Sequence, residues 1–211
     1  MNPDGFGLAL FLDDILGFNR KRFGELEERF RSIFPEIRSI QLRRQKAFRS
    51  PIEPDQITKP QQAEGKGLYF ELQTTNQSVP ASQASDGVLL VLAYLAVLFS
   101  PEPPRLLLVE EPENGIHPKR LTDVMNILRE VAKEQPHTQV LLTTHSPYAL
   151  DLFENPSDVT LCTKGDDGAI SITPLAESTT VKEQLSIFSL GEIWTAEGDE
   201  SLAADQVHSP R

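Results

Sequence analysis

The sequence predicts an α/β fold in which helices flank a parallel sheet. Two short, continuous apolar runs, 105–109 and 139–143, are typical of strands buried on both faces. Between them, residues 118–134 carry apolar side chains at helical spacing. Strand, helix and strand in succession predict neighbouring parallel strands with the helix packed on them.

The N-terminal segment, residues 1–80, is predicted to hold one helix and two strands. Apolar residues recur at three- and four-residue steps over 19–34, which predicts an amphipathic helix ended by the proline that follows. Residues 37–42 and 68–72 alternate apolar and polar, as half-buried strands do. Residues 50–66 are rich in proline and poor in apolar side chains, which predicts a linker.

Residues 81–195 are predicted to form the core of the domain. The apolar run 88–99 indicates a buried helix, because it is well short of the roughly 20 residues that span a bilayer. Residues 159–162 and 169–172 predict two further strands joined by a turn. The remainder, 196–211, is predicted to be a disordered tail.

The composition of the 211 residues excludes several classes of protein. Apolar residues make up 39% and charged residues 24%, as in a soluble globular domain. The single cysteine, Cys162, excludes an internal disulfide and a multi-cysteine zinc site, which fits a cytoplasmic protein. The formal net charge of −11 argues against a general affinity for nucleic acid or anionic membranes. We identify neither a membrane span nor a secretory signal.

The first apolar strand ends in two adjacent carboxylates, Glu110 and Glu111. They fall at the carboxyl edge of the predicted sheet, where open α/β sheets bind ligands. Because an unpaired buried carboxylate is costly, a strand tip that holds two needs a reason. A magnesium ion bound through water accounts for Glu110, and an attacking water accounts for Glu111. The alternative is an acidic turn without chemistry.

A histidine, His145, follows the second apolar strand within the sequence TTHSP. It falls at the same edge of the sheet, one strand–helix–strand unit after the two carboxylates. An imidazole there can hydrogen-bond a γ-phosphate and hold an attacking water in line. The alternative is a surface histidine whose hydrogen bonds are satisfied locally.

A third element, Ser85-Asp86-Gly87, stands just ahead of the long apolar helix. Amide groups and the positive dipole end at a helix N-terminus form a natural anion site. The alternative is an ordinary helix cap supplied by Ser85 or Asp86. Taken by itself, this element favours the ordinary cap.

Taken in order, the Ser-Asp-Gly element with its apolar helix, then LLLVEEPENGIHP, then LLTTHSP resemble ABC-type ATPases of the SMC/RecF-like class. The nearest resemblance is to bacterial AAA and OLD-like ATPases, and it covers roughly residues 6–195. It implies a P-loop NTPase-like sheet, ATP and Mg²⁺ as cofactors, hydrolysis of ATP, and a head-to-tail dimer.

The resemblance also implies a role for each residue of the three elements. Ser85 and Gly87 match the signature that reaches the γ-phosphate of ATP bound by a partner subunit. Glu110 matches the Walker B acid that holds Mg²⁺ through water, a position more often occupied by aspartate. Glu111 matches the catalytic glutamate, and His145 matches the switch histidine. Residues 113–118 match the dimer-contact loop.

The phosphate-binding loop of that family, GxxxxGKS/T, does not occur in the sequence. The Gly-Lys pair at Gly65-Lys66 has no glycine five residues before it. No backbone cradle and no lysine are therefore available for the phosphates. The chain is expected to be the C-terminal part of the ATPase domain, inactive alone. Its expected partner is a second copy or a polypeptide that supplies the missing lobe.

Two other functions remain as alternatives. One is an interaction module that has lost nucleotide chemistry, although such a module would not need to retain Glu111 and His145. The other is a module that binds DNA through phosphate contacts. Its candidate strip consists of the basic residues Arg38, Arg43, Arg44, Lys46 and Arg49.

Overall fold

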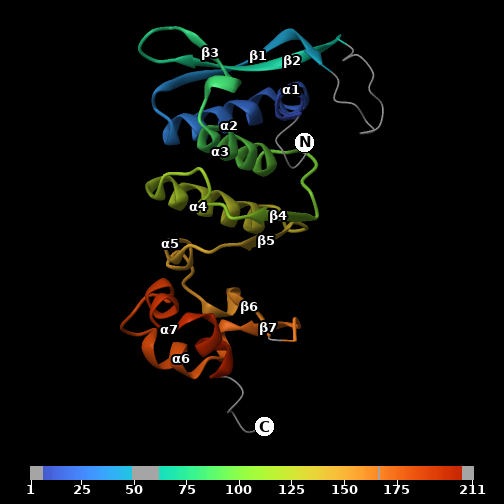
Figure 1. Ribbon diagram of the computed structural model, residues 1–211. Coiled ribbons are helices and arrows are strands. Elements are labelled where there is room, and N and C mark those ends of the chain that lie inside the picture. Colours follow the sequence, from blue (N-terminus) through green and yellow to red (C-terminus); the bar gives the residue numbers. More distant parts are fainter. Residues whose placement is uncertain (1–6, 49–61, 166, 206–211) are drawn as a thin grey trace. The chain divides into compact units, whose positions relative to one another are not determined.

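The computed structural model describes residues 7–48, 62–165 and 167–205, and Figure 1 shows their α/β arrangement. Two compact units are formed, one by Met1–Leu108 with Gly115–Leu141 and the other by Val109–Asn114 with Leu142–Arg211. The helices are α1 (Leu8–Phe18), α2 (Arg20–Ile33), α3 (Asp86–Leu98), α4 (Pro118–Glu134), α5 (Pro147–Leu150), α6 (Thr179–Gln184) and α7 (Leu190–Ala204). The strands are β1 (Ile37–Phe48), β2 (Gln62–Leu72), β3 (Ser78–Pro80), β4 (Leu106–Glu110), β5 (Gln139–Thr143), β6 (Thr160–Lys164) and β7 (Ile170–Pro174).

The first unit contains an antiparallel sheet in the order β1-β2-β3. The pairing places Ile40 opposite Phe70 and Leu42 opposite Leu68, so the apolar side chains of both strands share one face. The alternation predicted over 37–42 and 68–72 is confirmed. Both strands are longer than predicted, since pairing continues to Phe48 opposite Gln62.

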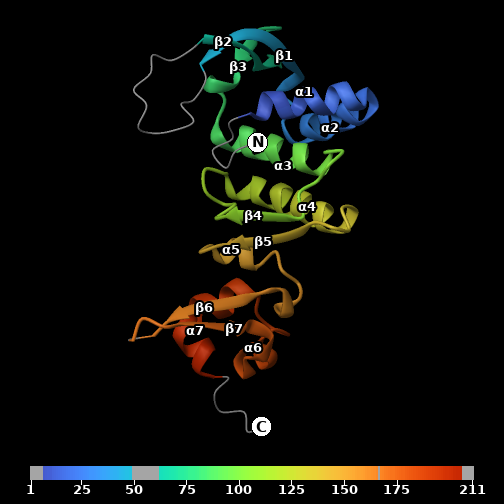
Figure 2. The same cartoon turned by 90° about the vertical axis from the view of Figure 1, so that its right-hand side faces the viewer.

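Helices cover the apolar face of that sheet in successive layers (Figure 2). Next to the sheet lie α1 and α2, followed by α3 and then α4. Phe30 of α2 stacks on Phe70 of β2 with ring centroids 5.8 Å apart. An ion pair between Arg29 of α2 and Glu130 of α4, 2.6 Å long, ties two of these helices at the surface. The predicted helices over 19–34 and 118–134 are confirmed as α2 and α4.

The strands β4 and β5 form a two-stranded parallel pair, as predicted. The expectation that both faces of these strands are buried is wrong. Leu106, Leu108 and Leu141 are 50%, 66% and 60% exposed. In both views α4 lies alongside β4 (Figures 1 and 2). The other two sheets are antiparallel, so among the described residues the parallel arrangement is confined to this pair.

The second unit has its own core beneath the β6–β7 hairpin. The hairpin confirms the strands predicted over 159–162 and 169–172, with Cys162 opposite Ile172. Side chains from four of its elements and the segments between them meet in one cluster. The buried members of this cluster are Leu150, Val159, Leu161, Leu175, Val181, Leu190, Ile193 and Leu202.

Two boundaries expected from the sequence need correction. The linker expected over 50–66 overlaps β2, which begins at Gln62, while 49–61 lie outside the described residues. The tail expected over 196–211 is helical as far as Ala204, with a break in α7 at Gly198, whose φ is 78°. Leu202 anchors this segment in the core. Residues 206–211 lie outside the described part of the chain.

The end of α7 is fixed by a carboxylate, which explains why it is ordered. Asp205 accepts hydrogen bonds from the Thr180 backbone N–H at 2.8 Å and the Ser178 hydroxyl at 2.9 Å. These two donors, the backbone N–H first, hold the pKa of Asp205 below its ordinary value. Across the described ranges, we find no helix with the length and apolar character needed to cross a membrane.

Two glycine-to-alanine substitutions, one at an open position in the first unit and one at a crowded position in the second, test the structure of each unit. Gly24 lies inside α2, and a Cβ atom there meets nothing within 4 Å. Because alanine costs less entropy than glycine in a helix, Gly24→Ala should raise the free energy of unfolding by about 0.5–1 kcal/mol. Urea denaturation measures this change, and a lower stability would contradict an open, helical site.

Gly191 at the start of α7 provides the matched opposite case. A Cβ atom there would lie 2.2 Å from the Pro147 carbonyl oxygen and 2.5 Å from Asp151 Oδ1. Gly191→Ala should therefore destabilise the second unit by about 1–3 kcal/mol.

Candidate functional site

The parallel pairing of β4 with β5 brings the ends of the two strands to one edge. Gln139 N–H donates to the Arg105 carbonyl and Glu111 N–H donates to the Thr143 carbonyl, each at 2.9 Å. The residue numbers of the bonded partners increase together along the two strands, from 105 and 139 to 111 and 143, as parallel pairing requires. Glu110 is the last residue of β4, and the segment with His145 begins directly after β5. Their backbones therefore meet at the carboxyl edge of the pair, where α/β folds bind ligands.

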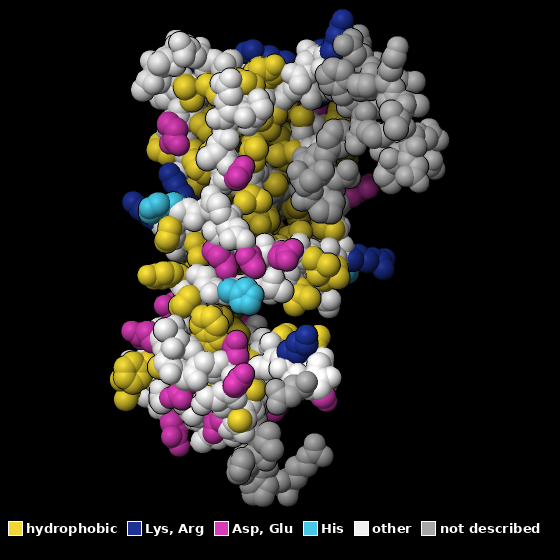
Figure 3. Space-filling view, viewed as in Figure 1, with side chains coloured by type: hydrophobic (Ala, Val, Ile, Leu, Met, Phe, Trp, Pro, Cys, Tyr) yellow, Lys and Arg dark blue, Asp and Glu magenta, His cyan; other side chains and the backbone are white. Residues whose placement is uncertain are grey.

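The side chains at this edge are open to a ligand. Glu110 and His145 are exposed, and Glu111 is half-buried. Figure 3 shows acidic side chains gathered at the level of β4 and β5, with a histidine just below them. The described residues form no group of three or more metal-ligating side chains. This edge thus offers single carboxylates to a hydrated cation and not a closed metal cage.

Glu111 has a backbone conformation that is unusual for a residue with a side chain. Its φ is 44°, in the left-handed region, which costs a non-glycine residue about 1–2 kcal/mol. The Glu111 N–H donates to the Thr143 carbonyl, and the Glu111 carbonyl accepts a hydrogen bond from Asn114 N–H at 2.9 Å. The side-chain amide of Asn114 also donates to the Glu111 carboxylate. Strain of this kind gathers at functional sites, where surrounding contacts maintain it.

A third carboxylate, Glu113, joins the two loops at this edge. Its Oε1 accepts from the Thr144 hydroxyl at 2.6 Å and from the His145 backbone N–H at 3.1 Å. The Thr144 oxygen in turn accepts from Ser146 N–H at 3.0 Å. The resemblance places Glu113 only in a dimer-contact loop, so these contacts were missed by sequence reasoning. The run EEPE, with three glutamates within four positions, is the signal that could have found it.

The Ser85-Asp86-Gly87 element lies in the first unit, at the start of α3. Ser85 is the N-cap residue and is exposed, yet its side chain makes no capping hydrogen bond. A Cβ atom on Gly87 would lie 3.2 Å from the Gly115 carbonyl oxygen, so the glycine allows a close approach of the two backbones. The structure thus brings the Ser-Asp-Gly element together with residues 115–116. The other candidate residues, Glu110, Glu111 and His145, belong to the second unit.

The His-Pro pair that closes the 113–118 segment has a local structural role. His117 is the N-cap of α4, and its Nδ1 accepts from Lys119 N–H at 3.2 Å. Pro118 follows at the first helical position, where the helix does not need the N–H group that proline lacks. This pair fixes the start of α4 and thereby the end of the loop that begins at Glu111.

The basic residues expected to form a DNA-binding strip do not share one surface. Arg43 and Arg44 are neighbours on β1, so their side chains leave opposite faces of the sheet, and Lys46 follows Arg44. Arg43 is engaged by two polar side chains and a tyrosine ring, and Arg38 by an amide and a carboxylate. Arg49 lies outside the described residues. The single strip expected from the sequence is wrong, because strand alternation divides it.

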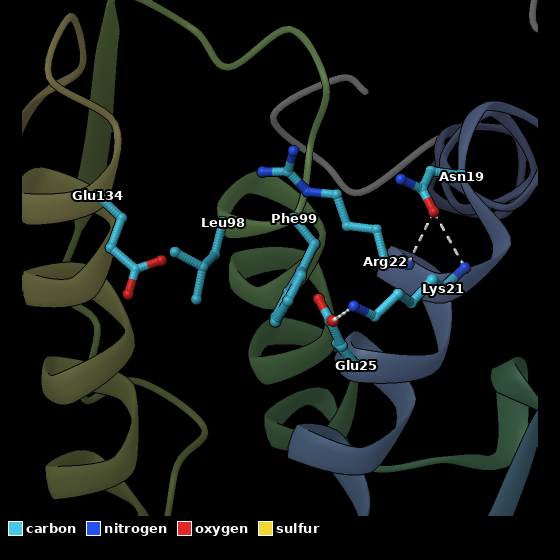
Figure 4. Close-up of a pocket in the computed structure, with 7 residues that line it drawn as sticks. All are labelled: Asn19, Lys21, Arg22, Glu25, Leu98, Phe99 and Glu134. Atoms are coloured by element: carbon cyan, nitrogen blue, oxygen red, sulfur yellow. Dashed lines mark hydrogen bonds and ion pairs between the residues drawn. The ribbon is translucent and has the colours of Figure 1, made fainter.

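A surface hollow of about 330 Å³ lies in the first unit, away from the candidate signature (Figure 4). Leu98 and Phe99 line it at the C-terminal end of α3, whose 13 residues extend for about 20 Å. Lys21 forms an ion pair with Glu25 at 3.8 Å on its rim. Asn19, Arg22 and Glu134 complete the lining. Because both charge signs are present and partly paired, the hollow has no clear preference for an anionic nucleotide.

The strained backbone at Glu111 can be tested by comparing Glu111→Gly with Glu111→Ala. Both changes remove the carboxylate and its contact with Asn114, but only glycine adopts a φ of 44° without penalty. The glycine variant should therefore be the more stable by about 1 kcal/mol in urea denaturation. Equal stability, or a more stable alanine variant, would contradict the strain.

Comparison with known proteins identifies a family for most of the chain. Residues 4–151 match the family described as "AAA domain, putative AbiEii toxin, Type IV TA system". One solved structure is described as "Structural biochemistry of ATP-driven dimerization and DNA stimulated activation of SMC ATPases". It matches at 14% identity and a TM-score of 0.46, over 82% of this chain and 94% of its own. No curated protein matches. Because the family match spans more than half of the sequence and includes every candidate site residue, the chain belongs to this family of AAA domains.

Proposed function

We propose that the chain supplies the hydrolytic part of an ATP-binding, ATP-hydrolysing domain of the ABC type. The observation that carries this proposal is the hydrogen bond from Glu111 N–H to the Thr143 carbonyl, 2.9 Å long. It joins the acidic end of β4 to the end of β5, two residues before His145. Membership of an AAA domain family supports the nucleotide chemistry that the geometry permits.

In this proposal each residue at the strand edge has one task. Glu110, exposed at the end of β4, orients water around a magnesium ion. Glu111 accepts a proton from the attacking water as general base. His145, exposed after β5, donates a hydrogen bond towards the γ-phosphate and keeps the water in line. Bound magnesium would neutralise charge on the phosphate oxygens.

The residues at the edge fit a magnesium nucleotide and not a tightly caged metal. Magnesium keeps several waters and is held by one or two carboxylates together with phosphate oxygens. Glu110 supplies such a carboxylate, and the described residues gather no set of three ligands that would replace the water shell. The donor set at this edge therefore suits ATP with Mg²⁺.

The phosphates of the nucleotide require a second polypeptide segment in this proposal. The 211 residues contain no GxxxxGKS/T loop, so no lysine and no glycine cradle from this sequence holds them. We propose that residues outside this sequence supply the loop. The exposed Ser85 hydroxyl, free of any capping bond, and the amides after it would contact nucleotide held by a partner subunit.

The central test of the proposal is the Glu111→Gln variant. The chain would be joined to a phosphate-loop segment from another member of the same AAA family, and Mg-ATP binding and turnover would be measured. Because glutamine cannot accept the proton, turnover should fall by about 10²–10⁴-fold while ATP binding is retained. Unchanged turnover would exclude Glu111 as the base. Glu111-dependent turnover by the 211 residues alone would exclude the need for an added loop.

A second prediction concerns His145. Replacing it with alanine should lower kcat by about 10²-fold and leave the dissociation constant of Mg-ATP within a few-fold, because one hydrogen bond to the γ-phosphate adds little to binding whereas the orientation of the attacking water is lost. Single-turnover hydrolysis and equilibrium binding separate the two effects. His137, beyond the end of α4, provides the matched control for losing an imidazole. Equal losses of binding and turnover would indicate a histidine that supports structure.

A further inference from the structure

The carboxylate of Glu113 is unusual because only one of its two oxygens makes hydrogen bonds. Oε1 accepts two hydrogen bonds, whereas Oε2 is buried and has no hydrogen-bond partner. A buried polar atom without a partner costs about 1–3 kcal/mol, and more when the group is charged. Native proteins leave few such atoms, and those that remain need a reason. Oε2 can therefore accept a hydrogen bond that this structure does not contain.

The bonded oxygen, Oε1, fixes the backbone that carries His145. The 2.6 Å contact with the Thr144 hydroxyl has the length of a charge-assisted hydrogen bond. Its donation commits the Thr144 proton, so the Thr144 oxygen presents a lone pair to Ser146 N–H. The His145 N–H points at the same carboxylate oxygen. Three consecutive residues of the turn after β5 are therefore oriented from one side chain.

Glu113 itself belongs to the loop after β4 and connects that loop to the turn after β5. Glu113 lies two residues beyond Glu111, whose backbone is bonded to Thr143. The loops that carry the proposed base and the proposed switch histidine are therefore tied at two points, one through backbone atoms and one through the Glu113 side chain. Because these two connections lie at different points along both loops, neither loop can rotate about one of them without breaking the other.

We propose that Glu113 is the positioning residue of the hydrolytic site: Oε1 holds Thr144 and His145 in register with Glu111, and Oε2 accepts a hydrogen bond from a water that enters with the magnesium nucleotide. This inference rests on the proposed function. Water suits Oε2 because it is a small donor that can reach a buried oxygen. The described residues provide no ligand cluster in which that oxygen would bind a metal directly.

Glutamine and alanine at position 113 separate the two oxygens. In Glu113→Gln the amide oxygen can replace Oε1, while an NH₂ donor replaces the acceptor Oε2. Glu113→Ala removes both. Thr144→Ser keeps the hydroxyl that donates to Glu113, and Thr144→Val removes it with little change of volume, so these two form a matched pair.

The first measurement is amide hydrogen exchange at His145 in the 211-residue chain without nucleotide. Exchange should be roughly 10- to 100-fold faster in Glu113→Ala, as expected from loss of a hydrogen bond to a charged group, and near the wild-type rate in Glu113→Gln. Protection at Leu161, in the core of the second unit, shows whether each variant is folded. An unchanged exchange rate at His145 in a folded Glu113→Ala variant would overturn the positioning role of Glu113 Oε1.

The second measurement is turnover in the loop-supplied form used to test Glu111. Glu113→Ala and Thr144→Val should lower kcat by about 10²-fold with little change in KM, and Thr144→Ser should retain the wild-type rate. Glu113→Gln should lose about tenfold in kcat although its His145 amide stays protected. Full activity of Glu113→Gln would overturn the role of Oε2. Absence of Glu111-dependent turnover in the wild type would refute the proposed function, while the exchange result would still decide whether Glu113 Oε1 holds the backbone at His145.

Discussion

The parallel pairing of β4 with β5 is the constraint on which the candidate site depends. Parallel strands end at the same edge, so residues more than thirty positions apart are brought together without a side-chain contact being needed. The bond from Glu111 N–H to the Thr143 carbonyl closes this pairing. It also holds Glu111 at a φ of 44°. The pairing thus fixes both the place and the backbone strain of the proposed base.

Several elements were predictable because their sequence pattern reflects burial within the chain itself. The apolar stripe of α4 and the alternation in β1 and β2, whose Ile40 and Phe70 are buried, are examples. The end of β1 was not predictable, since Arg43–Phe48 has no apolar alternation and is a strand because β2 pairs with it. The polar composition from residue 196 onward likewise predicts a tail, yet the burial of Leu202 and the two hydrogen bonds to Asp205 order the second half of α7. α1 was not anticipated.

The candidate site divides in the same way. The positions of Glu110, Glu111 and His145 at one edge follow from strand order, which a sequence reveals. The contacts of Glu113 depend on side-chain geometry across 31 and 32 residues of chain, for which no spacing rule exists. Similarly, the close approach of Gly87 to Gly115 needs coordinates. The expected basic strip was placed by counting charges along the sequence, whereas a strand sends neighbouring side chains in opposite directions, so Arg43 and Arg44 leave opposite faces of β1.

The bare face of the β4–β5 pair has a consequence for the behaviour of the molecule in solution. Leu106, Leu108 and Leu141 are open to water, and within the described ranges each of the two strands pairs only with the other. Unpaired strand edges beside apolar side chains act as templates for the addition of further strands. Charged residues and bulges commonly block such addition, and on this face Glu110 is the one charged residue beside three exposed leucines. Copies of the chain at high concentration therefore have a route to aggregate by pairing strand to strand along these edges.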